Sequence, residues 1–114
     1  MSKYKVVWAP EAQRDLLEIC QFIARDRPRV ALSLFKKIQK KCLALVKQPE
    51  SGRLIPELEQ IGNRYFRELI CSPYRVLYKN QEEGGLIRKV LVLAVVDSRR
   101  DFESTCLARI VRAV

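Results

Sequence analysis

The seven consecutive apolar residues from Val90 to Val96 are the sequence feature that most restricts the fold of this chain. The run is too short to cross a membrane, because a spanning helix needs about 20 apolar residues. A short apolar run without polar alternation is typical of a strand that is buried on both faces. We therefore expect residues 86–96 to form a long strand at the centre of a sheet.

Three further segments read as extended chain. Residues 3–8 are rich in aromatic and β-branched types and predict a first strand. Residues 64–70 and 74–79 predict two more, and the sequence Glu-Gly-Gly at positions 83–85 favours a hairpin turn before the central strand. Residues 53–58 are at best an edge segment, because Pro56 cannot donate a ladder hydrogen bond.

Apolar residues recur at helical spacing over residues 10–25 and again from position 28 to about position 47. The tight turn between these helices predicts an αα-hairpin, and residues 103–111 predict a short terminal helix. The fold class is therefore α+β: a two-layer sandwich with an N-terminal strand, the helical hairpin, an antiparallel meander and a C-terminal helix. We expect the hairpin to cover one sheet face and the other to remain open. With 114 residues, 48% of them apolar, the chain predicts a single domain over residues 1–114 with a real hydrophobic core.

Histidine is absent from the sequence, which excludes histidine-based triads, Cys-His pairs and histidine metal sites. The four cysteines are too far apart for a Cys-x-x-Cys site. We therefore expect no metal site, no cofactor and no disulfide. The first apolar run is too short for a signal peptide, and no segment is long enough to span a membrane, so we expect a cytoplasmic protein with reduced thiols.

The chain carries 22 Lys and Arg against 13 Asp and Glu, a net charge of +9. Such an excess suits a partner rich in phosphate or carboxylate groups. Several arginines of the meander, namely Arg67, Arg75, Arg99 and Arg100, would converge on the open sheet face, where their planar forks suit phosphate or carboxylate. The alternative is that these arginines form ordinary surface ion pairs with Glu57, Glu68 and Asp101.

Five segments in order resemble the RelE/ParE superfamily of toxins of type II toxin–antitoxin modules. They are Ala9-Pro10-Glu11-Ala12 with Asp15-Leu16, the loop from Pro49 to Gly52-Arg53, Tyr65 to Ile70, Pro73 to Tyr78, and Val90 to Asp101. The resemblance covers nearly the whole chain and favours the ParE-like branch. It implies that the first strand lies beside the last one, and that a cognate antitoxin protein silences the toxin.

The resemblance also implies functional residues. The recurrent basic positions of the family match Arg53, Arg67, Arg75 and Arg99 or Arg100, which we expect to bind a target or a phosphate. In ribonuclease members a histidine or tyrosine moves the proton. Here Asp97 stands after the last strand, and the terminal helix offers Phe102 and Cys106. If this chain is a ribonuclease, the catalytic candidates are Arg67, Arg75, Arg99, Arg100 and Tyr78.

Three functions follow from the resemblance. The first is a toxin that inhibits growth by binding DNA gyrase or a similar target. The second is a ribosome-dependent mRNA endoribonuclease of the RelE type, and the third is an inactive family member. We expect slow or absent cleavage of free RNA, because the expected proton-transfer residues are replaced. We also expect alanine at Arg67 or Arg75 to reduce toxicity with little loss of stability.

Overall fold

The computed structural model describes residues 4–113, so residue 3 of the expected first strand lies outside the described range. The elements, in chain order, are β1 (Lys5–Trp8), α1 (Pro10–Ala24), α2 (Pro28–Leu43), the 3-10 turn η1 (Ala44–Val46), β2 (Arg53–Leu54), α3 (Pro56–Glu59), β3 (Phe66–Cys71), β4 (Tyr74–Glu83), β5 (Leu86–Asp97) and α4 (Phe102–Ala113). The α+β class predicted from the sequence is confirmed.

The five strands form one sheet in the order β1-β5-β4-β3-β2. β5 lies between β1 and β4, which confirms that the apolar run belongs to an interior strand. β1 pairs with β5 in parallel, from Lys5 opposite Lys89 to Trp8 opposite Val92, whereas the other pairs are antiparallel. The first strand therefore lies beside the last one, as the family resemblance implied.

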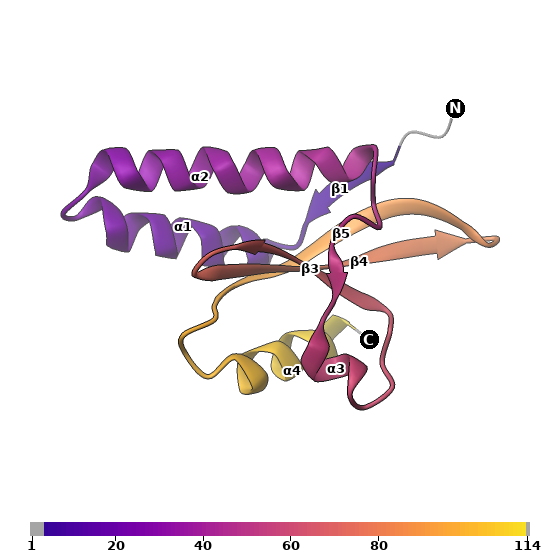
Figure 1. Ribbon diagram of the computed structural model, residues 1–114. Coiled ribbons are helices and arrows are strands. Elements are labelled where there is room, and N and C mark those ends of the chain that lie inside the picture. The colour runs from indigo at the N-terminus through magenta and orange to yellow at the C-terminus, as the bar shows by residue number, and fades with distance from the viewer. Residues whose placement is uncertain (1–3, 114) are drawn as a thin grey trace.

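The two long helices form the predicted hairpin along one face of the sheet (Figure 1). Each begins with a proline, a residue whose missing N–H and fixed φ suit the first helical position. Their apolar sides are buried against the sheet, with Ala12 and Leu16 on α1 and Ile38 and Cys42 on α2 completely or almost completely buried.

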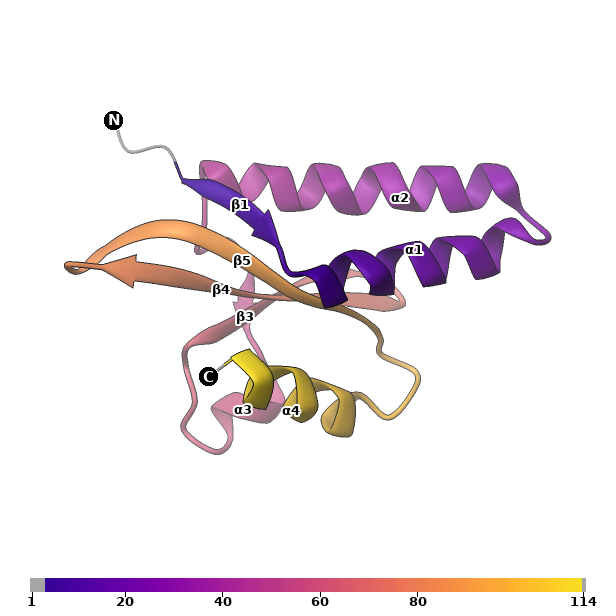
Figure 2. The ribbon, with the colours of Figure 1, turned by 180° about the vertical axis from the view of Figure 1, so that it is seen from behind.

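The opposite face of the sheet is also covered, so the expectation of an open face is wrong. Viewed from either side, α3 and α4 lie across the sheet from the helical hairpin (Figure 2). Three α4 side chains, Phe102, Cys106 and Ile110, are at most 6% exposed and belong to one apolar cluster with Phe66 and Leu77 of the sheet. In β5, Leu93, Ala94 and Val96 belong to this cluster, whereas Val92 and Val95 belong to the core beneath the helical hairpin. Contact with both cores explains why the strand is apolar from Val90 to Val96.

Smaller differences from the expected elements have local causes. The segment 53–58 divides into β2 and α3, because Pro56 begins a helical turn instead of ending a strand. The hairpin turn between β4 and β5 is confirmed, with Gly84 and Gly85 at φ values of 62° and 81°. Positive φ at both central residues is what a two-residue hairpin turn requires. Within residues 4–113, no helix combines the length and the apolar character needed to span a membrane.

The four cysteines are free thiols that differ in burial. Burial raises the pKa of Cys42 to about 12 and that of Cys106 to about 11. Burial also raises the pKa of Cys20, but this residue is only partly buried. We expect iodoacetamide to alkylate Cys20 first in the native protein at pH 8, because a thiol with a pKa near 12 is about 0.01% thiolate there. Intact-mass analysis over time measures this order. Native-state labelling of Cys42 as fast as that of Cys20 would contradict it.

Candidate functional site

Arg75 lies on β4 and points toward α4. Its guanidinium contacts two carboxylates, those of Glu68 on β3 and Glu57 on α3. Its Nε donates to Oε1 of Glu68 at 2.7 Å, and its Nη2 donates to Oε1 of Glu57 at 2.8 Å. Arg75 is 8% exposed and Glu68 only 1%. The alternative that Arg75 pairs with these two glutamates is thus confirmed, but the pair with Glu68 is buried and the pair with Glu57 is partly buried, so neither is an ordinary surface ion pair.

Arg53 and Phe102 complete this group, which we name the Arg75 cluster. The cluster consists of Arg53, Glu57, Glu68, Arg75 and Phe102. The guanidinium carbon of Arg75 lies 3.5 Å from the centroid of the Phe102 ring, within the range of a cation–π contact. Arg53 of β2 donates from Nε to Oε2 of Glu68 at 2.7 Å. The cluster therefore holds two cations and two carboxylates, and its formal charges cancel.

The charged groups of the cluster stabilise one another in their ionised forms. Burial disfavours the charged form of Arg75, but the hydrogen bonds with Glu57 and Glu68 outweigh burial and raise its pKa. The hydrogen bond from Arg75 in turn lowers the pKa of Glu57 below its ordinary value. Nε, Nη1 and Nη2 of Arg75 all donate to these carboxylates, so the guanidinium is engaged within the protein.

Tyr78, the proton-transfer candidate, is completely buried. Its hydroxyl donates to the carbonyl oxygen of Pro49 and accepts from the backbone N–H of Gly52, both at 2.9 Å. Burial raises the pKa of the phenol. Both hydrogen bonds fix the loop before β2, so the position of this side chain is structural.

Arg67 lies on the opposite face of β3 from Glu68, because successive strand residues alternate. Its Nη1 donates to the carbonyl oxygen of Gly52 at 2.8 Å and, at 3.3 Å, to that of Glu50. Arg67 therefore does not meet Arg75, and the prediction that the meander arginines converge on one face is wrong.

Arg99 and Arg100 follow the end of β5, where both are exposed. Arg99 pairs with Asp97 at 2.8 Å, and this hydrogen-bonded partner lowers the pKa of Asp97 to about 2. The two arginines line a hollow of about 350 Å³ together with Phe22 of α1 and Tyr74 of β4. The carboxylates of Asp15, Glu18 and Asp97 line the same hollow. Like Arg53, whose side chain is 57% exposed, Arg99 and Arg100 present guanidinium groups to solvent.

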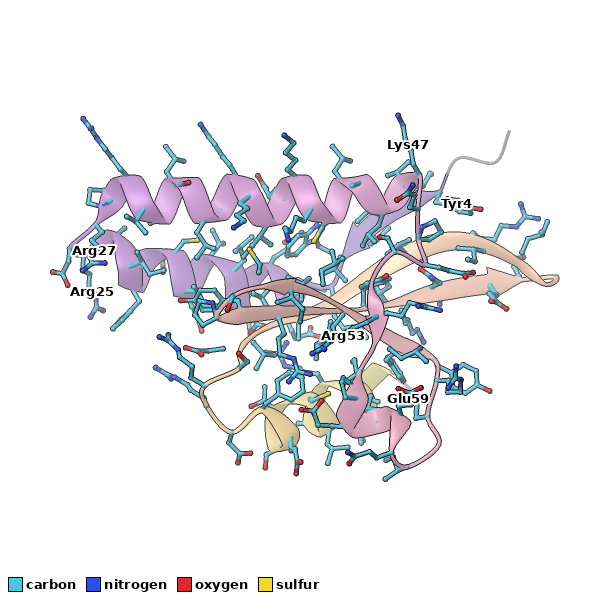
Figure 3. The ribbon with its side chains drawn as sticks, viewed as in Figure 1. Tyr4, Arg25, Arg27, Lys47, Arg53 and Glu59 are labelled. Atoms are coloured by element: carbon cyan, nitrogen blue, oxygen red, sulfur yellow. The ribbon has the colours of Figure 1, made fainter. Side chains whose placement is uncertain are left out.

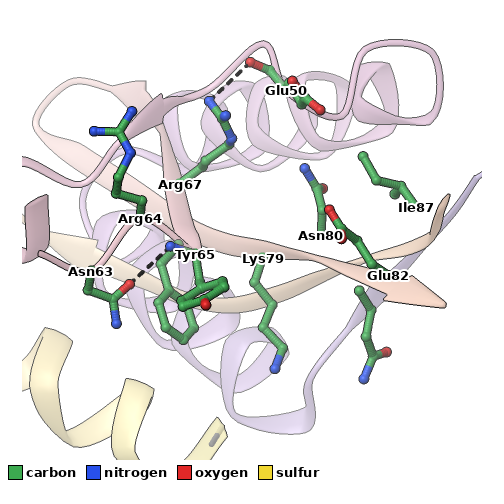
Figure 4. Close-up of a pocket in the computed structure, with 11 residues that line it drawn as sticks. Glu50, Asn63, Arg64, Tyr65, Arg67, Lys79, Asn80, Glu82 and Ile87 are labelled. Carbon is green, nitrogen blue, oxygen red and sulfur yellow. Dashed lines mark hydrogen bonds between the residues drawn. The ribbon is translucent and has the colours of Figure 1, made fainter. Parts of the chain in front are cut away.

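A larger hollow, of about 600 Å³, lies over β3 and β4 (Figure 4). Arg64, Arg67 and Lys79 line it beside Tyr65, whose residue surface is 80% exposed. Arg64 is paired with Glu59 at 2.8 Å. Glu50 and Glu82 also line the hollow. The positive charge in it is therefore largely balanced.

Sequence reasoning gave Glu57 and Glu68 only a surface role. It missed the contact of Phe102 with Arg75 and the pair between Asp15 and Arg109. Arg109 of α4 donates to the Asp15 carboxylate of α1 and to the carbonyl oxygen of Leu93, which ties the two helical layers to β5. A signal for Glu68 was present in the sequence, because Glu68 follows Phe66 by two residues and therefore lies on the same face of the strand. That face is the one covered by the apolar cluster of α4. Among the described residues, no group of three or more Cys, Asp or Glu is placed to hold a metal ion.

Residues 6–102 match the family model described as the ParE toxin of the type II toxin–antitoxin system parDE. Two solved structures share the fold: a chromosomal ParDE toxin–antitoxin system from P. aeruginosa and the RelBE2 toxin–antitoxin complex from Mycobacterium tuberculosis. The first has a TM-score of 0.64 at 16% identity and covers 83% of this chain and 96% of that chain. The second has a TM-score of 0.53 at 21% identity and covers 83% and 98%.

Curated relatives of a different kind also match. DNA mismatch repair proteins MutS from Synechococcus elongatus and another Synechococcus strain are each 36% identical to this chain over 91 residues. The match covers 80% of this chain but only 9% of either MutS protein. It therefore concerns a small part of those proteins and says nothing about mismatch repair by this chain.

Proposed function

Because the chain belongs to the ParE toxin family of type II toxin–antitoxin systems, we propose that it inhibits growth by binding DNA gyrase or a similar target, without cleaving RNA itself. A cognate antitoxin protein holds it silent. In this proposal Arg99 and Arg100 contact the target, whereas the Arg75 cluster maintains the fold.

The observation that carries the proposal is the neutralisation of Arg75. A ribonuclease needs a cation free to meet a phosphate and a group poised to move a proton. Arg75 is 8% exposed, and its guanidinium is engaged by two carboxylates and the Phe102 ring. Tyr78 is buried with both its hydrogen bonds made to backbone, and the sequence has no histidine. Binding without chemistry requires neither group.

The antitoxin is proposed to be a flexible, acidic protein that folds on this chain. A net charge of +9 favours such a partner and speeds its association at low salt. Two similar structures are of toxin–antitoxin systems, which supports the expectation of a protein partner. Coverage of Arg99 and Arg100 would silence the toxin directly.

The proposal is tested by a pair of assays on the wild type and an Arg99→Ala/Arg100→Ala variant. We expect the wild type to inhibit supercoiling by purified gyrase and the variant to lose most of that inhibition while its melting temperature stays unchanged. The matched control is Arg14→Ala/Arg88→Ala, which removes two exposed arginines elsewhere and should inhibit like the wild type.

The second assay measures transcript cleavage by primer extension in cells that express the wild type or the variant. If transcripts are cut on translating ribosomes and the cuts disappear in the Arg99→Ala/Arg100→Ala variant, the ribosome-dependent endoribonuclease replaces the gyrase proposal. If the control variant loses inhibition as strongly as the Arg99/Arg100 variant, general positive charge acts and the proposed site is wrong.

A further inference from the structure

The outward face of α2 carries a concentration of positive charge that the proposed target contact at Arg99 and Arg100 does not use. From Pro28 to Lys47 the chain has six basic residues and no acidic one, so this segment supplies +6 of the net charge of +9. Lys41 turns to the sheet, where its Nζ donates to the carbonyl oxygen of Ile70 at 2.9 Å. We name the remaining five the α2 basic face: Arg29, Lys36, Lys37, Lys40 and Lys47.

The cations of this face are aligned. Within α2, Arg29, Lys36 and Lys40 follow one another at intervals of seven and four residues, which are close to whole turns of a helix. Lys47 comes after α2, directly behind η1. The three helical residues lie opposite the buried side of α2, and Lys47 points away from the sheet in Figure 3. At a rise of about 1.5 Å per residue, the part of the row that lies within α2, from Arg29 to Lys40, is about 16 Å long.

The α2 basic face is not neutralised by the fold. All five residues are exposed, and none of them forms an ion pair with a residue in the part of the chain that the structure describes. By contrast, Arg53, Arg75 and Arg109 are each paired with a carboxylate. Like charges four residues apart, such as Lys36 and Lys40, destabilise a helix. A face that costs stability and lacks internal partners is suited to an external polyanion.

We propose that the α2 basic face binds the phosphodiester backbone of a double-stranded nucleic acid. A straight row of cations matches evenly spaced phosphates, and each cation that neutralises a phosphate releases a counterion. The face has no aromatic residue, whereas surfaces for single strands stack bases on aromatic rings. The contact would position the protein without reading base sequence. The face is separate from Arg99 and Arg100, so it does not depend on the gyrase proposal.

The test measures binding of the purified protein to a fluorescently labelled 20-base-pair DNA duplex and to the RNA duplex of the same sequence, between 50 and 300 mM salt. We expect log K to fall with log salt with a slope of about −4, since each neutralised phosphate contributes about −0.9. A Lys36→Gln/Lys40→Gln variant should bind at least about tenfold more weakly at the lowest salt, with a slope shallower by about 2.

The matched control is Lys5→Gln/Lys89→Gln, which removes the same charge from paired positions on β1 and β5. This variant should bind like the wild type. The two duplexes identify the source of the phosphates, DNA or RNA, by whichever binds more tightly. Equal weakening by both double variants, a wild-type slope near zero, or equally tight binding of polyglutamate would overturn the proposal.

Discussion

Replacing Arg75 by alanine is expected to destabilise the protein by about 3–5 kcal/mol, because it leaves Glu68 buried without its main cationic partner. Urea or thermal unfolding measures the effect, and a loss of this size lowers the melting temperature by at least about 10 °C. The result would correct the expectation from sequence that Arg75→Ala costs little stability. Any loss of toxicity in this variant would then report unfolding and not a lost target contact.

A second substitution separates the buried charge from lost packing. Glu68→Gln in the Arg75→Ala background should recover part of the stability, because it removes the unpaired carboxylate. Arg99→Ala is the control, since Arg99 is exposed and should change stability by less than about 1 kcal/mol. If Arg75→Ala is no more destabilising than Arg99→Ala, the Arg75 cluster does not support the fold.

The stability lost in Arg75→Ala relative to the wild type is expected to depend on pH. Glu57 has a lowered pKa in the folded protein, chiefly through its hydrogen bond from Arg75. Its contribution to stability is therefore present above its ordinary pKa of 4.5 and is lost as the pH falls through the lowered value. Accordingly, the stability difference between wild type and Arg75→Ala should narrow on acidification.

Gly52→Ala is expected to destabilise the protein by about 2–4 kcal/mol through overpacking and a lost hydrogen bond. A Cβ at this position would lie 2.5 Å from the hydroxyl oxygen of Tyr78 and 2.7 Å from the carbonyl oxygen of Glu68. Neither atom can withdraw easily, since Tyr78 is completely buried and the carbonyl belongs to the backbone of β3. The loop would move and lose its hydrogen bonds with Tyr78 and Arg67.

Thermal unfolding of Gly52→Ala beside Ser51→Ala measures this effect. Ser51 is the preceding residue and is exposed, so its substitution should change the melting temperature by no more than a few degrees. A Gly52→Ala protein as stable as Ser51→Ala would mean that the loop does not rest on Tyr78 as closely as described.

Much of the fold follows from local patterns. The apolar run from Val90 to Val96 identified the interior strand, and helical spacing identified the hairpin, because both patterns depend on neighbours within one element. The expectation of an uncovered sheet face misjudged this same apolar run. A strand that is apolar on both sides requires two covering layers, and the second layer is α4, through Phe102, Cys106 and Ile110.

The candidate site was less predictable, because it depends on contacts between distant segments. Alternation along β3 places Arg67 and Glu68 on opposite faces, but only the packing of α3 and α4 over the sheet shows that Arg75 reaches Glu57 and Phe102. The role of Tyr78 depends on a loop 29 residues earlier in the chain. No pattern within β4 indicates that contact.

The parallel pairing of β1 with β5 also delays the completion of the sheet until late in synthesis. Lys5 pairs with Lys89, so the two strands are translated 84 residues apart, which takes about 4–17 s at 5–20 residues per second. Until β5 leaves the ribosome, the apolar side of the helical hairpin has no complete sheet to cover. The nascent chain therefore spends seconds with an exposed hydrophobic surface before it can bind a target, and during that time a chaperone competes with aggregation for it.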